Sequence, residues 1–369
     1  MRGALKGLVV NFRFQYLPMN ATAPSPKHLR SFRVRNFKCF EDFSIQGLGM
    51  VNLIVGDNNI GKTCLLEALL FDEDHMTMLY NFCGTLEFRK LLYPPDNYLK
   101  PILKDSKKAL QFDYETGDGI PANLSLEIIP GTALSNKDQI ANIDISRFKI
   151  SDLYARSLWN GDLTISRIKQ EDLHNYNDFT PFVPSNLRYN DELAEYYSEK
   201  INHHKPSRRE FEESLRFILP DLESVLIDVE NAKPYLAVTL KNDDRIHPLP
   251  EFGDGVVKAV RLFLEIAKAE GGRLMVDEIE MGLHYSRLKA FWQNILREAK
   301  RRDVQLFLSS HSREALAYLK EALEEEDMTE YREEVRCFAI HKLRKGGIKT
   351  IRFNWEEFQY ALDQEFEMR

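Results

Sequence analysis

The segment Gly56-Asp57-Asn58-Asn59-Ile60-Gly61-Lys62-Thr63 decides the fold, because it fits the pattern G-x-x-x-x-G-K-[ST] in full. It follows the apolar run 50–55 and precedes residues 62–71, which carry leucine and alanine at helical spacing. A buried strand, a glycine-bracketed loop and a helix are therefore predicted in succession. A chance match on a glycine turn is the plain alternative, and the flanking strand and helix weigh against it.

A loop of this kind is suited to bind a polyphosphate. Its backbone N–H groups can turn inward around the phosphates, and the N-terminus of the following helix adds a favourable dipole. We expect Lys62 to neutralise charge on the β- and γ-phosphates of ATP, and the Thr63 hydroxyl to be a ligand of Mg²⁺. The predicted nucleotide-binding residues of this segment are Gly56, Asp57, Asn58, Asn59, Ile60, Gly61, Lys62, Thr63 and Cys64.

A second apolar stretch, Arg273–Val276, ends in two acids, Asp277 and Glu278. Asp277 suits a carboxylate that holds a metal-bound water, so Asp277 and Thr63 form the predicted metal site. Glu278 suits a general base for a hydrolytic water. On their own, acids after a strand can also be solvated loop residues or a helix N-cap.

A third apolar stretch, 306–308, is followed by two serines and His311 at its carboxyl end, where open α/β sheets bind their ligands. His311 is therefore a candidate to contact the γ-phosphate. The alternative is a histidine that caps the helix starting near Ser312. The order of the three motifs along the chain favours the phosphate site.

The composition is that of a soluble globular protein. Of 369 residues, 43% are apolar and 29% are charged, and the length leaves room for two domains. The net charge of −7 argues against non-specific binding to nucleic-acid backbones, so any contact with DNA would be local. The four cysteines match neither a disulfide framework nor a zinc site, which favours a cytoplasmic location. No apolar run approaches the roughly 18 residues of a membrane span.

Periodicity predicts further strands and helices on both sides of a long, less regular middle region. Strands are expected at 32–35, 43–45, 110–114, 124–128, 224–229, 235–240, 304–308, 335–341 and 350–353. Helices are expected within 190–219, with a break at Lys205-Pro206, and at 256–269, 286–301 and 314–326. The alternation of helix and strand after Gly255 implies a parallel sheet.

With these motifs in order, the sequence resembles an ABC-type ATPase head of the branch that includes the structural-maintenance-of-chromosomes (SMC), RecF and overcoming-lysogenisation-defect (OLD) proteins. The resemblance covers residues 29–71 and 250–320. Residues 29–40 resemble the opening strand of OLD-type heads, and Glu280-Met281-Gly282-Leu283-His284 resembles their E-x-G-L-H continuation.

The resemblance assigns roles to the motif residues. Asp277 and Glu278 match the Walker B pair, and His311 matches the switch histidine. Lys62, Glu278 and His311 are then the expected catalytic residues.

The resemblance also implies the fold class. We expect an α/β fold of the P-loop NTPase, ABC-ATPase head type, with a mixed central sheet, an N-terminal antiparallel β subdomain and an inserted helical region. Residues 1–28 are expected to be an extension and 29–369 the head. Within the head, 29–71 and 250–369 are expected to form the nucleotide-binding core, and 72–249 an inserted β-hairpin and helical subdomain.

The signature loop departs from the pattern of ABC transporters. They have Leu-Ser-Gly-Gly-Gln, whereas this chain has Phe252-Gly253-Asp254-Gly255 before a helix, similar to the Gly-Asp-Gly form of OLD-like heads. In the family this loop closes the γ-phosphate site of the opposite subunit, so Gly253, Asp254 and Gly255 are candidate nucleotide-binding residues. The resemblance thus implies a homodimer, or a higher homo-oligomer, with ATP between its heads.

An ATP-driven conformational switch is the function that the resemblance implies. Neither a long coiled coil nor a Toprim nuclease domain is recognisable in the sequence. The switch is therefore expected to act on a separately encoded effector, Toprim-like or a toxin, in antiviral defence. One alternative is a RecF-like head that clamps DNA, supported by basic groups within 205–209, 297–302 and 342–349. Another is a scaffold that binds ATP without hydrolysing it.

Overall fold

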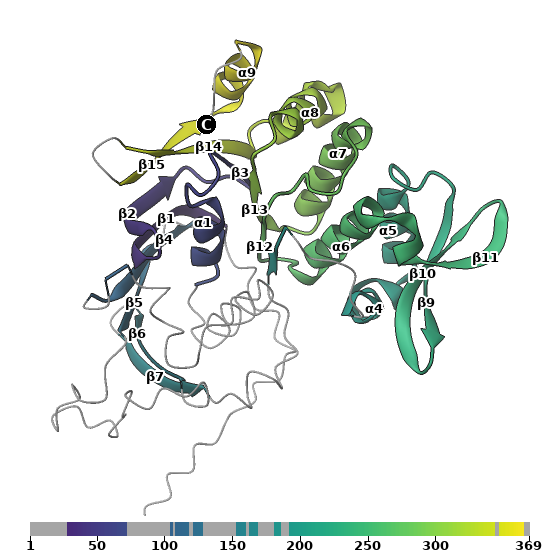
Figure 1. Cartoon of the computed structure of the whole chain (residues 1–369), viewed down its shortest axis with the longest axis horizontal. Helices are drawn as coiled ribbons and strands as arrows, with labels where there is room; N and C mark the ends of the chain where they lie inside the picture. The colour runs from purple at the N-terminus through teal and green to yellow at the C-terminus, as the bar shows by residue number, and fades with distance from the viewer. Residues whose placement is uncertain are drawn as a thin grey trace, which may run out of the picture.

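The computed structural model describes residues 28–71, 104–105, 108–117, 121–127, 153–159, 162–168, 181–185, 192–343 and 347–364. Within these ranges the strands form three sheets, which Figure 1 shows together with the helices. Most of the expected extension and much of the inserted region lie outside the described residues. The boundaries expected between domains therefore stay predictions.

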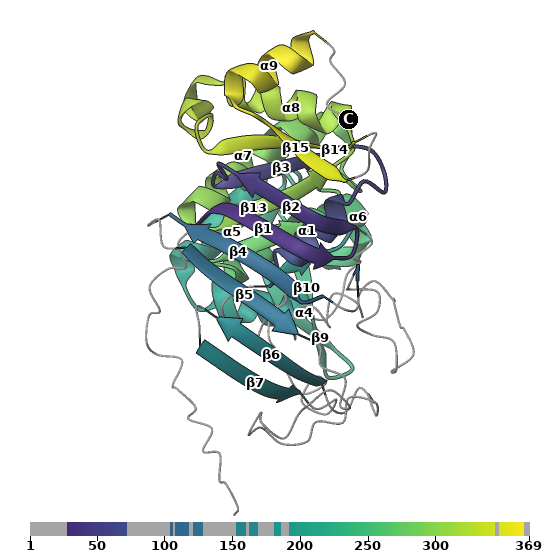
Figure 2. The same ribbon diagram turned by 90° about the vertical axis from the view of Figure 1, so that its left-hand side faces the viewer.

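A six-stranded antiparallel sheet opens the described chain, with strand order β2-β1-β4-β5-β6-β7 (Figure 2). On β1, Phe32 and Val34 are buried and Arg33 between them is exposed, the alternation that predicts a half-buried strand. β4 pairs directly with β1, so strands of the inserted region continue the N-terminal sheet. The strands are β1 (Leu29–Phe37), β2 (Phe40–Gln46), β4 (Leu110–Thr116), β5 (Pro121–Glu127), β6 (Leu153–Trp159) and β7 (Asp162–Ile168).

The central sheet is mixed, with strand order β15-β14-β3-β13-β12-β8. The five strands from β14 to β8 run parallel, and β15 pairs antiparallel with β14 at the edge. The predicted mixed sheet is thereby confirmed. Its strands are β3 (Val51–Val55), β8 (Phe182–Val183), β12 (Arg273–Val276), β13 (Gln305–Ser310), β14 (Val335–Lys342) and β15 (Ile348–Phe353).

Side chains of the central strands alternate between two hydrophobic cores, one on each face of the sheet. On β13, Leu306 and Leu308 belong to one core and Phe307 to the other. Strands that are buried on both faces have nearly continuous apolar sequences, which explains the patterns that predict β3, β12 and β13. The first core includes residues of α6 (Asp254–Lys268), α7 (Tyr285–Arg301) and α8 (Arg313–Glu324); the second includes residues of α1 (Lys62–Ala68) and of the strands β1, β2, β4 and β5 (Figure 1).

A smaller antiparallel sheet precedes α6, formed by β9 (Leu222–Glu230), β10 (Lys233–Leu240) and β11 (Asp243–Pro248). The predicted helix break is confirmed, because α5 begins at Lys205 with Pro206 in its first turn, where proline is favoured. The other helical segments are α4 (Glu192–Tyr197), η4 (Ser198–Asn202), α5 (Lys205–Leu215), η5 (Leu249–Phe252), η6 (Glu326–Tyr331) and α9 (Trp355–Asp363). Over the described part of the chain, no helix is both long and apolar enough to cross a membrane.

A buried ion pair lies on α6. Arg261 Nη1 donates to Glu265 Oε1 at 3.0 Å, and both side chains are almost completely buried. Burial raises the pKa of Glu265 from 4.5 to about 7, although the charge of Arg261 opposes this shift. Ionisation of Glu265 therefore lowers the stability of the folded state.

We expect the contribution of Glu265 to stability to be fully present below pH 4.5 and lost as the pH rises through about 7, because the folded state binds this proton more tightly. Glu265→Gln cannot ionise, so its free energy of unfolding should lack this decline, a difference of up to about 3 kcal/mol. Urea unfolding of both proteins across this pH range measures the difference. Parallel pH profiles would contradict the raised pKa.

Candidate nucleotide-binding site

The loop between β3 and α1 needs backbone conformations that few residues adopt. Gly56 and Gly61 have φ angles of +147° and +114°, and Asn59 has a φ of +61°. Glycine reaches positive φ without strain, and asparagine tolerates the left-handed region. A Cβ at Gly56 would lie 2.7 Å from the carbonyl O of Ile340, and one at Gly61 would lie 2.9 Å from Sγ of Cys39. Conformation and space both require these glycines.

Lys62 folds back into this loop. Its Nζ donates to the carbonyl O of Gly56 at 2.8 Å and to that of Asp57 at 2.9 Å. Burial lowers the pKa of Lys62, and the charges of Asp277 and Glu278 oppose this shift. The ammonium group therefore lies inside the loop and in the electrostatic field of the acids that follow β12.

The remaining predicted loop residues differ in exposure. The segment 57–59 is exposed, Ile60 packs partly against the second core, and Cys64 is half-buried in the first turn of α1. Cys64 is a free thiol, as are Cys39 and Cys337. The exposed part of the loop is thus its tip, and its base is packed against the protein.

Three segments meet at the carboxylate of Asp277. Thr63 Oγ1, in the first turn of α1, donates to Asp277 Oδ2 at 3.0 Å and Oδ1 at 3.2 Å. Ser309 Oγ, near the end of β13, donates to Asp277 Oδ1 at 2.5 Å. Asp277 is buried, and the following helix α7 is capped by His284 instead. The alternative in which Asp277 is a solvated loop residue or a helix cap is therefore wrong.

Glu278 has an unusual backbone conformation, with a φ of +50°. Its N–H donates to Ser309 Oγ at 2.8 Å, and its carbonyl O accepts from Lys258 Nζ at 2.7 Å. Left-handed backbone at a residue other than glycine is strained and is often found at functional sites. The sequence motifs predict no role for Ser309 or Lys258. The one available signal for Lys258 is a lysine placed between the apolar pairs Val256-Val257 and Ala259-Val260 of α6.

His311 lies beside the same acids. Its Nδ1 is 3.7 Å from Glu278 Oε1 and 3.4 Å from Glu280 Oε1. Glu280 Oε1 also accepts the backbone N–H groups of His311 and Ser312, each at 3.2 Å. Helix α8 is capped by Ser312, whose Oγ accepts the N–H of Ala315 at 3.1 Å, so the interpretation of His311 as a helix cap is wrong.

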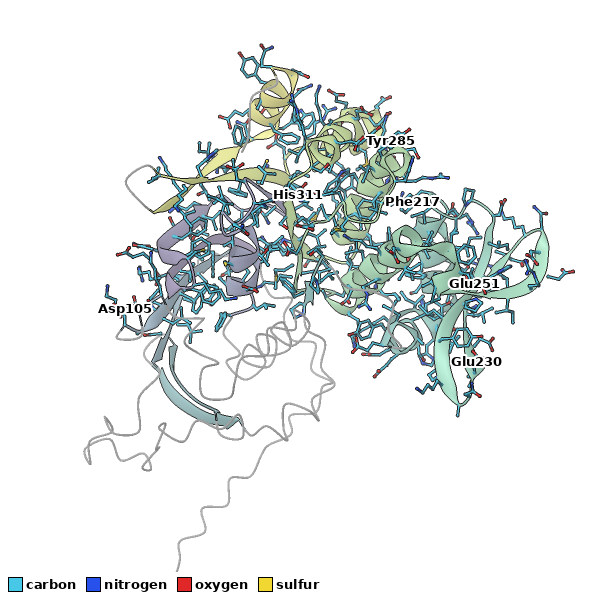
Figure 3. All side chains as sticks on the ribbon, in the orientation of Figure 1. Asp105, Phe217, Glu230, Glu251, Tyr285 and His311 are labelled. Atoms are coloured by element: carbon cyan, nitrogen blue, oxygen red, sulfur yellow. The ribbon has the colours of Figure 1, made fainter. Side chains whose placement is uncertain are left out.

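The loop Gly253–Gly255 is not joined to the phosphate loop within one chain. Over the described residues, no hydrogen bond connects it to 56–63. Gly255 instead lies against the backbone after Glu278, where a Cβ would be 2.5 Å from the carbonyl O of Gly282. Figure 3 shows Glu251, two residues before the loop, beside the β9–β11 sheet and well away from His311. Gly253 and Asp254 are exposed to solvent.

The donor set fits Mg²⁺ with a phosphate chain. Mg²⁺ is usually bound through one or two protein oxygens, with phosphate and water oxygens completing its shell. The Thr63 hydroxyl and the Asp277 carboxylate already lie within hydrogen-bond distance of each other. The described residues contain no group of three or more His, Cys, Asp and Glu side chains that could hold a metal alone. The loop glycines and Lys62 suit the phosphates.

Comparison with known proteins gives matches over most of the chain. A family profile described as "AAA domain, putative AbiEii toxin, Type IV TA system" matches residues 51–317. A protein of Helicobacter pylori (strain ATCC 700392 / 26695) named "ATP/GTP phosphatase" is 23% identical over 348 residues, which cover 81% of this chain and 89% of that protein.

Solved structures show the fold. The one described as "Crystal structure of the SmcHead bound to the C-winged helix domain of ScpA" matches with a TM-score of 0.55 and 12% identity, covering 90% of this chain and 99% of that chain. The "SMC head domain from Thermotoga maritima" has a TM-score of 0.45 and 14% identity, covering 88% and 99% of the two chains. The first likeness confirms the predicted fold class, a P-loop ATPase head with a mixed central sheet.

We expect Gly61→Ala to destabilise the protein by about 1–3 kcal/mol. Alanine would be strained at the φ of +114°, and its Cβ would lie too close to the Cys39 thiol. Gly347→Ala is the matched control, since its φ is +89° but a Cβ there meets nothing within 4 Å. Urea unfolding gives the free energy of unfolding of the two variants, and titration with ATP measures whether the loop still binds the nucleotide. Equal losses of stability would show that the close approach to Cys39 has no effect.

Proposed function

The chain belongs to the family described as "AAA domain, putative AbiEii toxin, Type IV TA system" and is an ABC-like P-loop ATPase, and from this premise we propose that it is a switch in which two heads close around ATP. The segment 280–284 and the Gly-Asp-Gly loop support a place in its OLD-like branch. The name of the Helicobacter pylori relative, "ATP/GTP phosphatase", supports nucleotide hydrolysis as the reaction.

The observation that carries this proposal is the convergence of separate segments on Asp277 and Glu278. Thr63 reaches Asp277 from the phosphate loop, and His311 reaches Glu278 from the end of β13. Lys62 neutralises charge on the β- and γ-phosphates, and Thr63 and Asp277 hold the metal and its water. The backbone N–H groups of the loop and of the first turn of α1 bind the phosphate oxygens.

Glu278 is the proposed general base. Its carboxylate takes a proton from the water that attacks the γ-phosphorus, while ADP leaves with the electrons of the broken P–O bond. His311, whose half-exposed ring has Nδ1 3.7 Å from Glu278 Oε1, contacts the γ-phosphate. Mg²⁺, when bound at Thr63 and Asp277, supplies positive charge that stabilises the phosphate oxygens.

The second head is proposed to complete the site. The exposed N-terminus of α6, which begins at Asp254 directly after Gly253, offers the backbone N–H groups of its first turn to the γ-phosphate of another copy. Met281 and Tyr285, in and just after the segment that follows Glu278, are 44% and 52% exposed, which suits a contact between copies. ATP binds the closed dimer better than the open form, and hydrolysis removes that bias.

We propose that the switch acts on a separately encoded effector, either a Toprim-like nuclease or a toxin, in antiviral defence. The toxin system in the family description supports this proposal. The step from fold to biological role is one of analogy.

One of the three basic groups that support DNA binding as the alternative function is paired within the chain. Four basic residues of the segment 297–302 form ion pairs with acidic side chains: Arg297 with Asp327, Lys300 with Glu330, Arg301 with Glu210 and Glu298, and Arg302 with Glu298 and Glu270. Paired cations contribute little to the attraction of a phosphate backbone. In the third basic group, Arg344 and Lys345 lie outside the described residues.

Glu278→Gln tests the reaction. The amide keeps the shape of the side chain but cannot accept the proton, so kcat should fall by about a hundredfold or more while ATP affinity is retained. Phosphate release and equilibrium ATP binding measure the two quantities. Lys62→Ala is the control that should lose affinity instead. If the original protein has barely detectable turnover and Glu278→Gln has the same turnover, the non-hydrolysing scaffold is favoured.

The dimer is tested with the same Glu278→Gln protein, which should retain ATP between two heads. With ATP and Mg²⁺, light scattering coupled to gel filtration should report about twice the monomer mass, because each nucleotide contacts both copies. ADP replaces ATP in the control and should leave a lower mass. The same mass with both nucleotides would contradict an ATP-dependent sandwich.

A further inference from the structure

Lys258 lies in α6, three residues after Gly255, between the buried residues Val257 and Ala259. Its Nζ donates to the carbonyl O of Glu278 at 2.7 Å. Lys258 is partly buried, and a backbone carbonyl and nearby carboxylates supply the partners that a partly desolvated ammonium group needs.

Two hydrogen bonds hold the backbone of Glu278, one on each side of the residue. Ser309 Oγ binds the N–H of Glu278 at 2.8 Å, and Lys258 Nζ binds its carbonyl O. Because Glu278 has a φ of +50°, the residue needs such contacts to stay in this conformation. Its backbone conformation in turn places the Cα–Cβ bond from which its carboxylate extends.

The charges around Lys258 agree with this arrangement. Burial lowers the pKa of Lys258 to about 8, and the carboxylates of Glu280, Glu278 and Asp277 oppose the shift. The ammonium group therefore lies within the acidic cluster of the site, although it is on the helix that follows the Gly-Asp-Gly loop. Its attraction to three acids offsets part of their mutual repulsion.

A second contact joins the same two segments. The backbone of Gly255 approaches the carbonyl O of Gly282 so closely that a Cβ would lie 2.5 Å from it. The N-terminus of α6 is thus tied to the segment after β12 at two places, once through Gly255 and once through Lys258. We therefore expect a displacement of the loop 253–255 to move the segment 278–282 with it.

We propose that Lys258 is a positioning residue through which the loop Gly253–Gly255 sets the direction of the Glu278 carboxylate. The inference rests on the proposed function, since that loop meets the nucleotide of the other copy and Glu278 acts in its own site. Arrival of a second head at the loop is then transmitted to the base in the same chain. Hydrolysis at one site depends in this way on the nucleotide held at the other.

Lys258→Met tests this role, because it removes the donor and keeps the length and apolar stem of the side chain. We expect kcat to fall about tenfold or more, with the dissociation constant of ATP within about twofold, since the lost contact orients the base and touches no phosphate. Lys258→Arg should restore most of the rate. Lys268→Met is the matched control on the same helix, as its Nζ pairs with Glu199 and not with the site.

Hydrogen exchange gives a readout that does not depend on turnover. Amides of the segment 277–283 should exchange about tenfold faster in Lys258→Met and at the original rate in Lys268→Met, at equal thermal stability. Unchanged exchange and rate in Lys258→Met would overturn the inference, as would a parallel loss of ATP affinity. If the original protein turns over no faster than Glu278→Gln, the proposed function fails, and exchange alone decides whether Lys258 fixes this segment.

Discussion

The carboxylate of Asp277 is the contact on which the rest of the site depends. It accepts hydrogen bonds from Thr63 and Ser309, and so joins the first turn of α1 to the ends of β12 and β13. Thr63 and Asp277 are 214 residues apart in the chain, and the strand order β3-β13-β12 brings them together. A buried carboxylate without such donors would be strongly destabilising, which makes the hydroxyl groups part of the fold as well as of the site.

Glu278 extends this arrangement to α6 through Lys258, a residue to which the sequence motifs assign no role. Ser309 binds both Asp277 and the N–H of Glu278, so one hydroxyl group orders two neighbouring acids. Lys258 binds the other side of the Glu278 peptide from α6. The same helix begins at the loop that is proposed to meet a second head. The geometry therefore offers a short path, through packed and hydrogen-bonded groups, from Glu278 to the loop at which the second head is proposed to bind.

Residues with a fixed spacing or context could be predicted from the sequence, and residues that act through tertiary contacts could not. The loop 56–63 has a pattern of its own, and Asp277 follows a strand whose apolar run is unmistakable. A hydrogen bond from Lys258 to a distant carbonyl group has no such pattern, nor has the two-residue strand β8. Helix α9 is not among the expected helices, although Asn354 and Glu357 have the spacing of a capping box.

The most direct measurement is a crystal structure of the Glu278→Gln protein with ATP and Mg²⁺. The account predicts a triphosphate enclosed by the loop 56–63, with Mg²⁺ about 2.1 Å from Thr63 Oγ1 and one of its waters on Asp277. It also predicts His311 against the γ-phosphate. A nucleotide bound elsewhere, or bound with Asp277 and His311 out of reach of the metal and the phosphates, would contradict it.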